Sequence, residues 1–129
     1  MMDYSKMSDL QINKAVLEAL YGGGPEYRTT DEGKLIILRH VNTVEFGEHV
    51  ERTEDAGEFD PCNSWADAGP IIQQNNISLL KCERMDEWVA GSSYWVDGAE
   101  WSVDWLSDDK NPLRAAMIVY LMMHDKGEE

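Results

Sequence analysis

Histidine and cysteine are the residue types in this chain best suited to metal binding or nucleophilic catalysis. His40, His49 and His124 are far apart, with no His-x-His or His-x-x-x-His spacing. We interpret them as ordinary surface or helix-end residues, because a metal site would have to be assembled from distant segments. Cys62 and Cys82 match no zinc spacing and are either reduced thiols or one disulfide. We expect reduced thiols, since no secretory leader is apparent, and we predict no metal and no cofactor.

Cys62 is the most plausible nucleophile, because a lone cysteine near a helix start can have a lowered pKa. Asp60 and Asp67 flank it, however, and negative neighbours raise a thiol pKa. We therefore predict a structural thiol. Carboxylate pairs are inevitable among 25 acidic residues and carry little information about acid–base catalysis. No Gly-x-Ser-x-Gly, dinucleotide fingerprint or phosphate loop occurs, so no catalytic residue is predicted.

The charge balance argues against several classes of partner. The chain has 129 residues and a formal net charge of −14, from 25 acidic residues against 11 lysines and arginines. The basic residues are scattered singly from Lys6 to Lys126, so phosphate backbones and anionic membranes should repel this surface. We expect no direct nucleic-acid binding and no membrane binding.

The most explicit turn signal is Val96–Asp97–Gly98–Ala99, which is typical of a two-residue β-hairpin. Counting outward pairs Val96 with Ala99 and predicts strands over 88–96 and 99–105. One face then collects the aromatic and aliphatic residues Trp88, Tyr94, Trp101, Val103 and Trp105. We expect this face to pack beneath the helix that follows, after a polar turn at 107–110.

The opposite face of the hairpin is mostly polar, and Trp95 is its exception. Exposed tryptophans often make binding hot spots. Together with nearby carboxylates it forms the candidate interaction surface, which consists of Trp95, Glu100, Asp104, Asp108 and Asp109.

A helix over 112–124 should occupy the centre of the protein. Asn111 can cap it, and Pro112 suits the first helical position. The apolar run from Ala115 to Met123 implies burial on nearly all sides, and it is far short of the ~20 residues of a membrane span. One sheet cannot cover so many apolar sides, so we expect a homodimer through this helix at Met122, Ile118 or Val119.

Two further helices are predicted near 9–20 and 64–75. Ser8 and Gln11 have the spacing of a capping box, and Gly22 should end that helix, with Asn13 on its polar face. Residues 34–41 should form a strand covered on both faces, and 45–60 a solvated connection or an exposed edge strand. This order predicts a single α+β domain over 1–129, in which helices pack an antiparallel or mixed sheet.

The segments FDPCNSWADAGPIIQQNNISL (59–79) and NPLRAAMIVYLMM (111–123) resemble the NinX family of lambdoid phages and prophages, as does the opening segment 2–20. The layout is also similar to a phage α/β/α sandwich domain. The resemblance implies a phage or prophage origin and action in the host cytoplasm. It implies no activity and no catalytic residue, because the family is a domain of unknown function.

These observations favour a non-enzymatic phage accessory protein that contacts an unidentified host or phage protein. One alternative is an acidic DNA mimic that blocks a nucleic-acid-binding host protein, with carboxylates in place of phosphates. Another is a small enzyme whose site is assembled from residues distant in sequence.

Overall fold

The computed structural model describes residues 3–22, 25–96 and 100–127. Its elements, in chain order, are η1 (Tyr4–Lys6), α1 (Asp9–Tyr21), β1 (Tyr27–Thr29), β2 (Leu35–Glu45), β3 (Glu48–Glu58), α2 (Trp65–Gln74), β4 (Ile77–Cys82), β5 (Glu87–Val96), β6 (Glu100–Asp109) and α3 (Pro112–Gly127). The strands form two antiparallel sheets, β1-β2-β3 and β4-β5-β6. The predicted α+β class is confirmed.

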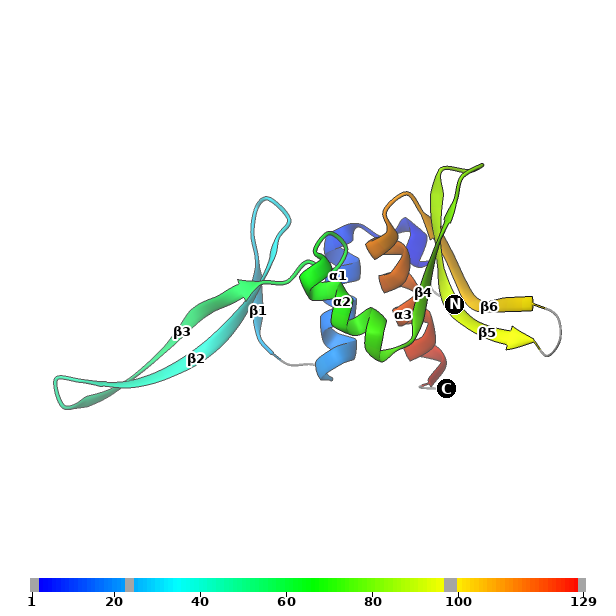
Figure 1. The fold of residues 1–129 in the computed structure, drawn as a ribbon. Coiled ribbons are helices and arrows are strands. Elements are labelled where there is room, and N and C mark those ends of the chain that lie inside the picture. The colour runs from blue at the N-terminus through cyan, green and yellow to red at the C-terminus, as the bar shows by residue number, and fades with distance from the viewer. Residues whose placement is uncertain (1–2, 23–24, 97–99, 128–129) are drawn as a thin grey trace.

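The helices lie between the two sheets (Figure 1). α3 packs on all three strands of the β4-β5-β6 sheet, and α1 and α2 pack on α3. This layer order differs from the α/β/α sandwich that the resemblance implied, in which helices flank a sheet. None of the described helices is long and apolar enough to cross a membrane.

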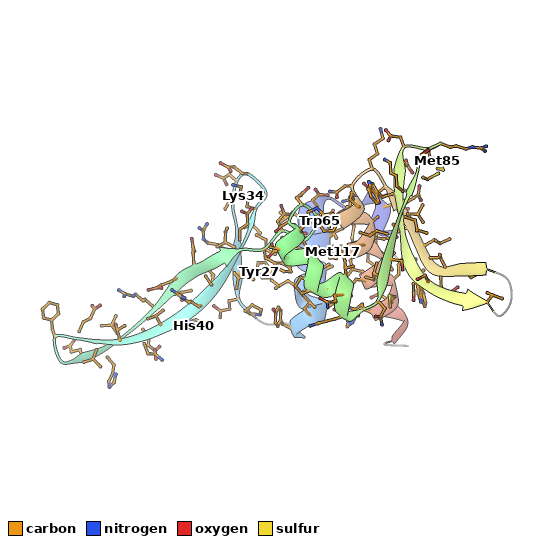
Figure 2. The ribbon with its side chains drawn as sticks, in the orientation of Figure 1. Tyr27, Lys34, His40, Trp65, Met85 and Met117 are labelled. Atoms are coloured by element: carbon orange, nitrogen blue, oxygen red, sulfur yellow. The ribbon has the colours of Figure 1, made fainter. Side chains whose placement is uncertain are left out.

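α3 is buried on nearly all sides, as predicted. Every residue from Ala115 to Leu121 is buried, and Met117 and Val119 have no exposed surface. Figure 2 shows Met117 in the middle of the helical layer. The dimer prediction was based on apolar sides of this helix that one sheet cannot cover, and α1 and α2 cover those sides within the chain. Ile118 and Val119 are therefore buried within the chain itself, and Met122 is half-buried.

The predicted helix boundaries are close to those observed, because local capping sets them. Ser8 and Gln11 form the expected capping box, and Gly22 ends α1 with a φ of 64°. Ser64 caps α2, which includes Pro70 within its length. The amide nitrogen of Leu113 donates to Asn111 Oδ1 at 2.9 Å, so Asn111 caps α3.

The predicted hairpin is present, but its register and length were wrong. Val96 pairs with Glu100 rather than Ala99, and position 95 pairs with position 101. The predicted turn falls on residues 97–99, which lie outside the described part of the chain. Because one residue of slip exchanges the two faces, the aromatic positions do not all share one face. The polar turn at 107–110 was also wrong, because β6 continues to Asp109, and β4 was missed entirely.

A β-bulge divides the β5–β6 pair, since Gly91 alone on β5 stands opposite Trp105 and Leu106 on β6. Trp105 has a φ of 57° and packs against the core. That left-handed conformation costs a bulky residue on the order of 1–2 kcal/mol. The bulge adds a second slip to the one at the turn, so that Ala90 pairs with Ser107 rather than with Trp105.

The β1-β2-β3 sheet contains a long two-stranded ribbon that extends away from the helices (Figure 1). Residues 34–41 do form a strand, but the prediction that both faces are covered was wrong. Leu35 is buried, whereas the strand beyond Leu38 is largely exposed. β3 is the exposed edge strand that was one interpretation of residues 45–60. The contiguous aliphatic residues 35–38 pack at the root of the ribbon, where α1 contacts β2.

Candidate functional site

Polar side chains converge where the N-terminal ends of the helices meet. The segment 60–63, just before α2, lies between the first turns of α1 and α3. Asn13 of α1 is the centre of the cluster and is only 4 % exposed. Its Nδ2 donates to Asp60 Oδ1 at 2.8 Å, and its Oδ1 accepts from the Cys62 amide at 3.2 Å. The prediction that Asn13 lies on a solvated face was wrong, because this segment covers it.

Asn111 joins the same segment to α3. Its Oδ1 caps the helix, while its Nδ2 donates to the Cys62 carbonyl oxygen at 2.6 Å. The neighbouring Asn63 amide donates to Asp9 Oδ2 at 3.2 Å, and so reaches α1. Each asparagine therefore connects two segments that are distant in sequence.

Arg114 completes the cluster and is the most heavily bonded side chain in it. Its guanidinium donates to Asp9 Oδ1 at 2.7 Å and to Asp109 Oδ2 at 3.0 Å. It also donates to the carbonyl oxygens of Met7 at 2.6 Å and Ser5 at 3.2 Å. The side chain is 14 % exposed, so this one residue ties the N-terminal segment, α1, β6 and α3 together.

Cys62 lies inside this cluster as an unreactive thiol. Burial, reinforced by the charge of Asp9, raises its pKa from 9.0 to about 12. The predicted direction is confirmed, although burial contributes more than the flanking carboxylates. Cys62 and Cys82 are both free, as expected. A thiol that stays protonated at neutral pH is a poor nucleophile, so the cluster has the character of a structural clamp.

The histidines lie on separate elements. His40 lies on the ribbon (Figure 2). Its Nε2 is 3.2 Å from Glu26 Oε2. His49 lies near the ribbon's end, and His124 stacks on Tyr120 with ring centroids 6.2 Å apart. No group of three or more potential metal ligands occurs among the residues that the structure describes.

The predicted interaction surface is only partly gathered in one place. Asp104 and Asp108 are exposed on β6. Asp109 is a structural residue instead, because it accepts from Arg114 and from the Asn111 amide at 2.9 Å. The side chains of Trp95 and Glu100 lie outside the described part of the structure. Asp108 lies beside Glu87 on the neighbouring strand and raises the pKa of that carboxyl group.

A second candidate surface, at the end of the ribbon, was missed by sequence reasoning. Val44 is 65 % exposed and Phe46 is fully exposed in the turn between β2 and β3. The prediction for residues 45–60, a solvated connection or an exposed edge strand, gave Phe46 no role. The available signal was Phe46–Gly47, a turn-forming glycine preceded by an aromatic residue between two β-branched strands.

A hollow of about 460 Å³ lies at the root of the ribbon between α1 and α2. Tyr21, Ile37 and Phe59 give it an apolar floor, and Glu58 and Asp67 are its acidic residues. Asp67 already accepts a hydrogen bond from the Asp60 amide at 2.9 Å. The hollow could therefore accommodate a small molecule, but it does not present a pair of free acidic groups to one.

Comparison with known proteins agrees with the segments that first suggested a relationship. No curated protein matches the chain. The family described as Bacteriophage P22, NinX matches residues 3–124. This range includes both sheets and the first turn of every described helix. The chain therefore belongs to the phage P22 NinX family.

Proposed function

We propose that this phage accessory protein is a non-enzymatic protein-interaction module that acts in the host cytoplasm. The observation that supports the proposal best is the β2–β3 ribbon. Beyond Leu38 and Asp55 its side chains are mostly exposed, and it adds little to the core. An isolated two-stranded hairpin is marginally stable in water. A projection of this length is therefore best explained by contact with another molecule.

The polar cluster supports the same proposal from the other direction. Its carboxylates and amides are bonded to one another or to Arg114, and Cys62 holds its proton. A catalytic site needs an acid, base or nucleophile that is in the right protonation state and within reach of a substrate. An enzyme assembled from distant residues has less support than a binding protein.

The DNA-mimic alternative also has less support. Arg28, Arg39 and Arg52 are interspersed among the ribbon's acids and pair with Asp55, Glu54 and Glu45. A phosphate mimic would present carboxylates without these neighbouring cations.

A shortened ribbon tests the proposal. Residues 40–53 are replaced by Asn-Gly, a favoured two-residue hairpin turn. The new turn joins Arg39 to Glu54, which are cross-strand partners six pairs away from Glu45 and Glu48, the pair that flanks the original turn. The shortened and intact chains are used for affinity capture from phage-infected cells, and captured proteins are identified and purified for direct binding. We expect the shortened chain to keep its helical circular dichroism and melting temperature but to lose the partner.

Equal binding of the purified partner by both chains would show that the ribbon is not the interaction element. If both chains still capture the same protein, the partner binds another surface, for which the exposed residues Asp104 and Asp108 of β6 are the candidates. Turnover of a substrate by the intact chain would overturn the non-enzymatic proposal.

A further inference from the structure

Phe46 lies at the end of the ribbon, in the turn that joins β2 to β3. The residue is fully exposed, and Val44 beside it is 65 % exposed. The ribbon carries this turn away from the helical layer (Figure 1). An aromatic side chain here buries no surface within its own chain, so it makes no hydrophobic contribution to folding.

The backbone at Phe46 is also unfavourable for a bulky residue. Phe46 has a φ of 52° and Gly47 a φ of 79°, the positive values of a type I′ turn. Asparagine, aspartate and glycine suit the first of these positions, whereas a bulky side chain costs on the order of 1–2 kcal/mol. Both backbone preference and solvation therefore favour Asn over Phe in the free protein. A residue that the isolated chain disfavours on two counts suggests a role in a complex.

The charges around Phe46 indicate the partner's chemistry. Glu45 and Glu48 are directly opposite each other at the base of the turn, and Glu51 lies further along β3. Arg52 approaches Glu45 at 3.5 Å, while Glu48 and Glu51 form no ion pair with any described residue. Like charges placed opposite each other are destabilising in a sheet. A cationic surface docked at this end would relieve that repulsion.

We propose, as an extension of the proposed function, that Phe46 is an anchor that inserts into an apolar pocket of a partner protein whose rim carries lysine or arginine. A buried aromatic anchor inside a ring of complementary charge is the usual arrangement of an interface hot spot. A second copy of this chain is a poorer occupant, because it would bring the same acids to the same place. An anionic lipid surface is a poorer occupant for the same electrostatic reason.

The substitution Phe46→Asn separates folding from binding. Asn-Gly is the preferred type I′ sequence, so we expect a higher melting temperature than for the native chain. We expect affinity for the partner to fall by at least about tenfold, because the anchor is lost. Trp65→Gln is the matched control. Trp65 is 59 % exposed at the start of α2, far from the turn at the end of the ribbon, and its loss should leave affinity unchanged (Figure 2).

The partner is identified with the full chain carrying benzoylphenylalanine, a photo-crosslinking residue, at position 46 in phage-infected cells. The crosslinked protein is purified and titrated with the native chain, Phe46→Asn, Trp65→Gln and the double variant Glu48→Lys/Glu51→Lys. We expect crosslinks within an apolar pocket bordered by basic residues. Affinity should fall with added salt, and charge reversal should weaken it and flatten that salt dependence.

Several results would overturn the anchor. These are unchanged affinity of Phe46→Asn, crosslinks only to a second copy or to lipid, crosslinks to an acidic surface, or no crosslinked protein at all. If the shortened ribbon loses a partner that Phe46→Asn still binds with native affinity, the anchor fails while the interaction function stands. If the chain with the shortened ribbon also binds the partner with native affinity, the ribbon is not the interaction element and the Phe46 anchor is wrong as well.

Discussion

Two arginines, each paired with two carboxylates, show how differently the helical layer and the ribbon use the same chemistry. Arg114 pairs with Asp9 and Asp109 and is 14 % exposed. Arg52 pairs with Glu45 and Glu54 at 3.5 and 3.4 Å and is 51 % exposed. Water screens the second group, whereas the first is held among helix starts that depend on it. The ion pairs of the helical layer therefore contribute to stability, whereas those of the ribbon add little to it.

The comparison is tested most severely by removing each positive charge. Arg114→Met leaves Asp9 and Asp109 partly buried and unpaired, and should lower the free energy of unfolding by about 3–5 kcal/mol. Arg52→Met should cost at most about 1 kcal/mol. Urea denaturation of both variants measures the difference. Equal losses would show that the ribbon is as stabilising as the helical layer.

Truncation of apolar side chains compares how much packing in the helical layer and in the ribbon contributes to stability. Met117 has no exposed surface, so Met117→Ala should leave a cavity and cost about 2–5 kcal/mol. Val44→Ala on the ribbon should change stability by no more than about 0.5 kcal/mol. Thermal and urea unfolding followed by circular dichroism provide both values. A large loss from Val44→Ala would mean that the ribbon packs against something in the free protein.

The bulge in β5 and β6 extends the comparison to backbone packing. A Cβ at Gly91 would collide with the Val103 side chain and lie 2.8 Å from the Asp104 carbonyl oxygen. Gly91→Ala should therefore cost about 1–3 kcal/mol. Gly69→Ala is the control, since its Cβ would meet no atom within 4 Å and alanine favours a helix by roughly 0.5–1 kcal/mol. Opposite signs of the two changes in stability are expected from chemical denaturation, and a stabilising Gly91→Ala would contradict the close approach.

At neutral pH the smallest expected effect is that of the Cys62 thiol, which changes stability only in alkaline solution. Its folded pKa of about 12 lies above the ordinary value of 9.0, so the folded state holds this proton more tightly. Its stabilisation is complete below pH 9 and is lost as the pH rises from 9 toward 12. The native chain should lose at most about 1.4 kcal/mol per pH unit more than Cys62→Ala across that interval.

Unfolding titrations of the two chains at several pH values measure this difference directly. Thiol labelling of the native protein near pH 8 is a second readout, in which half-buried Cys82 should react well before Cys62. Parallel stability curves for the native chain and Cys62→Ala, or rapid labelling of Cys62, would show that the thiol is not buried as described.

Local sequence was enough for the helices and for the character of the last one. Ser8, Ser64 and Asn111 are capping residues whose hydrogen bonds close within a few residues, so the sequence alone shows them. The apolar run in α3 likewise required burial whatever the partner elements were. Resemblance in the segments around these helices was also sufficient to identify the family.

Only the tertiary structure decided how β-strands pair and which polar residues meet. A one-residue slip and the Gly91 bulge changed the faces of β5 and β6, and neither has a strong local signal. The sequence placed Asn13 on the polar face of its helix, but in the structure the segment before α2 covers it. Aliphatic residues 35–38 predicted a covered strand, but nothing in the sequence shows that β2 leaves the core after Leu38. Capping and helical periodicity depend on neighbours along the chain, whereas pairing, coverage and projection depend on residues far away in sequence, and that is why the first were predicted and the second were not.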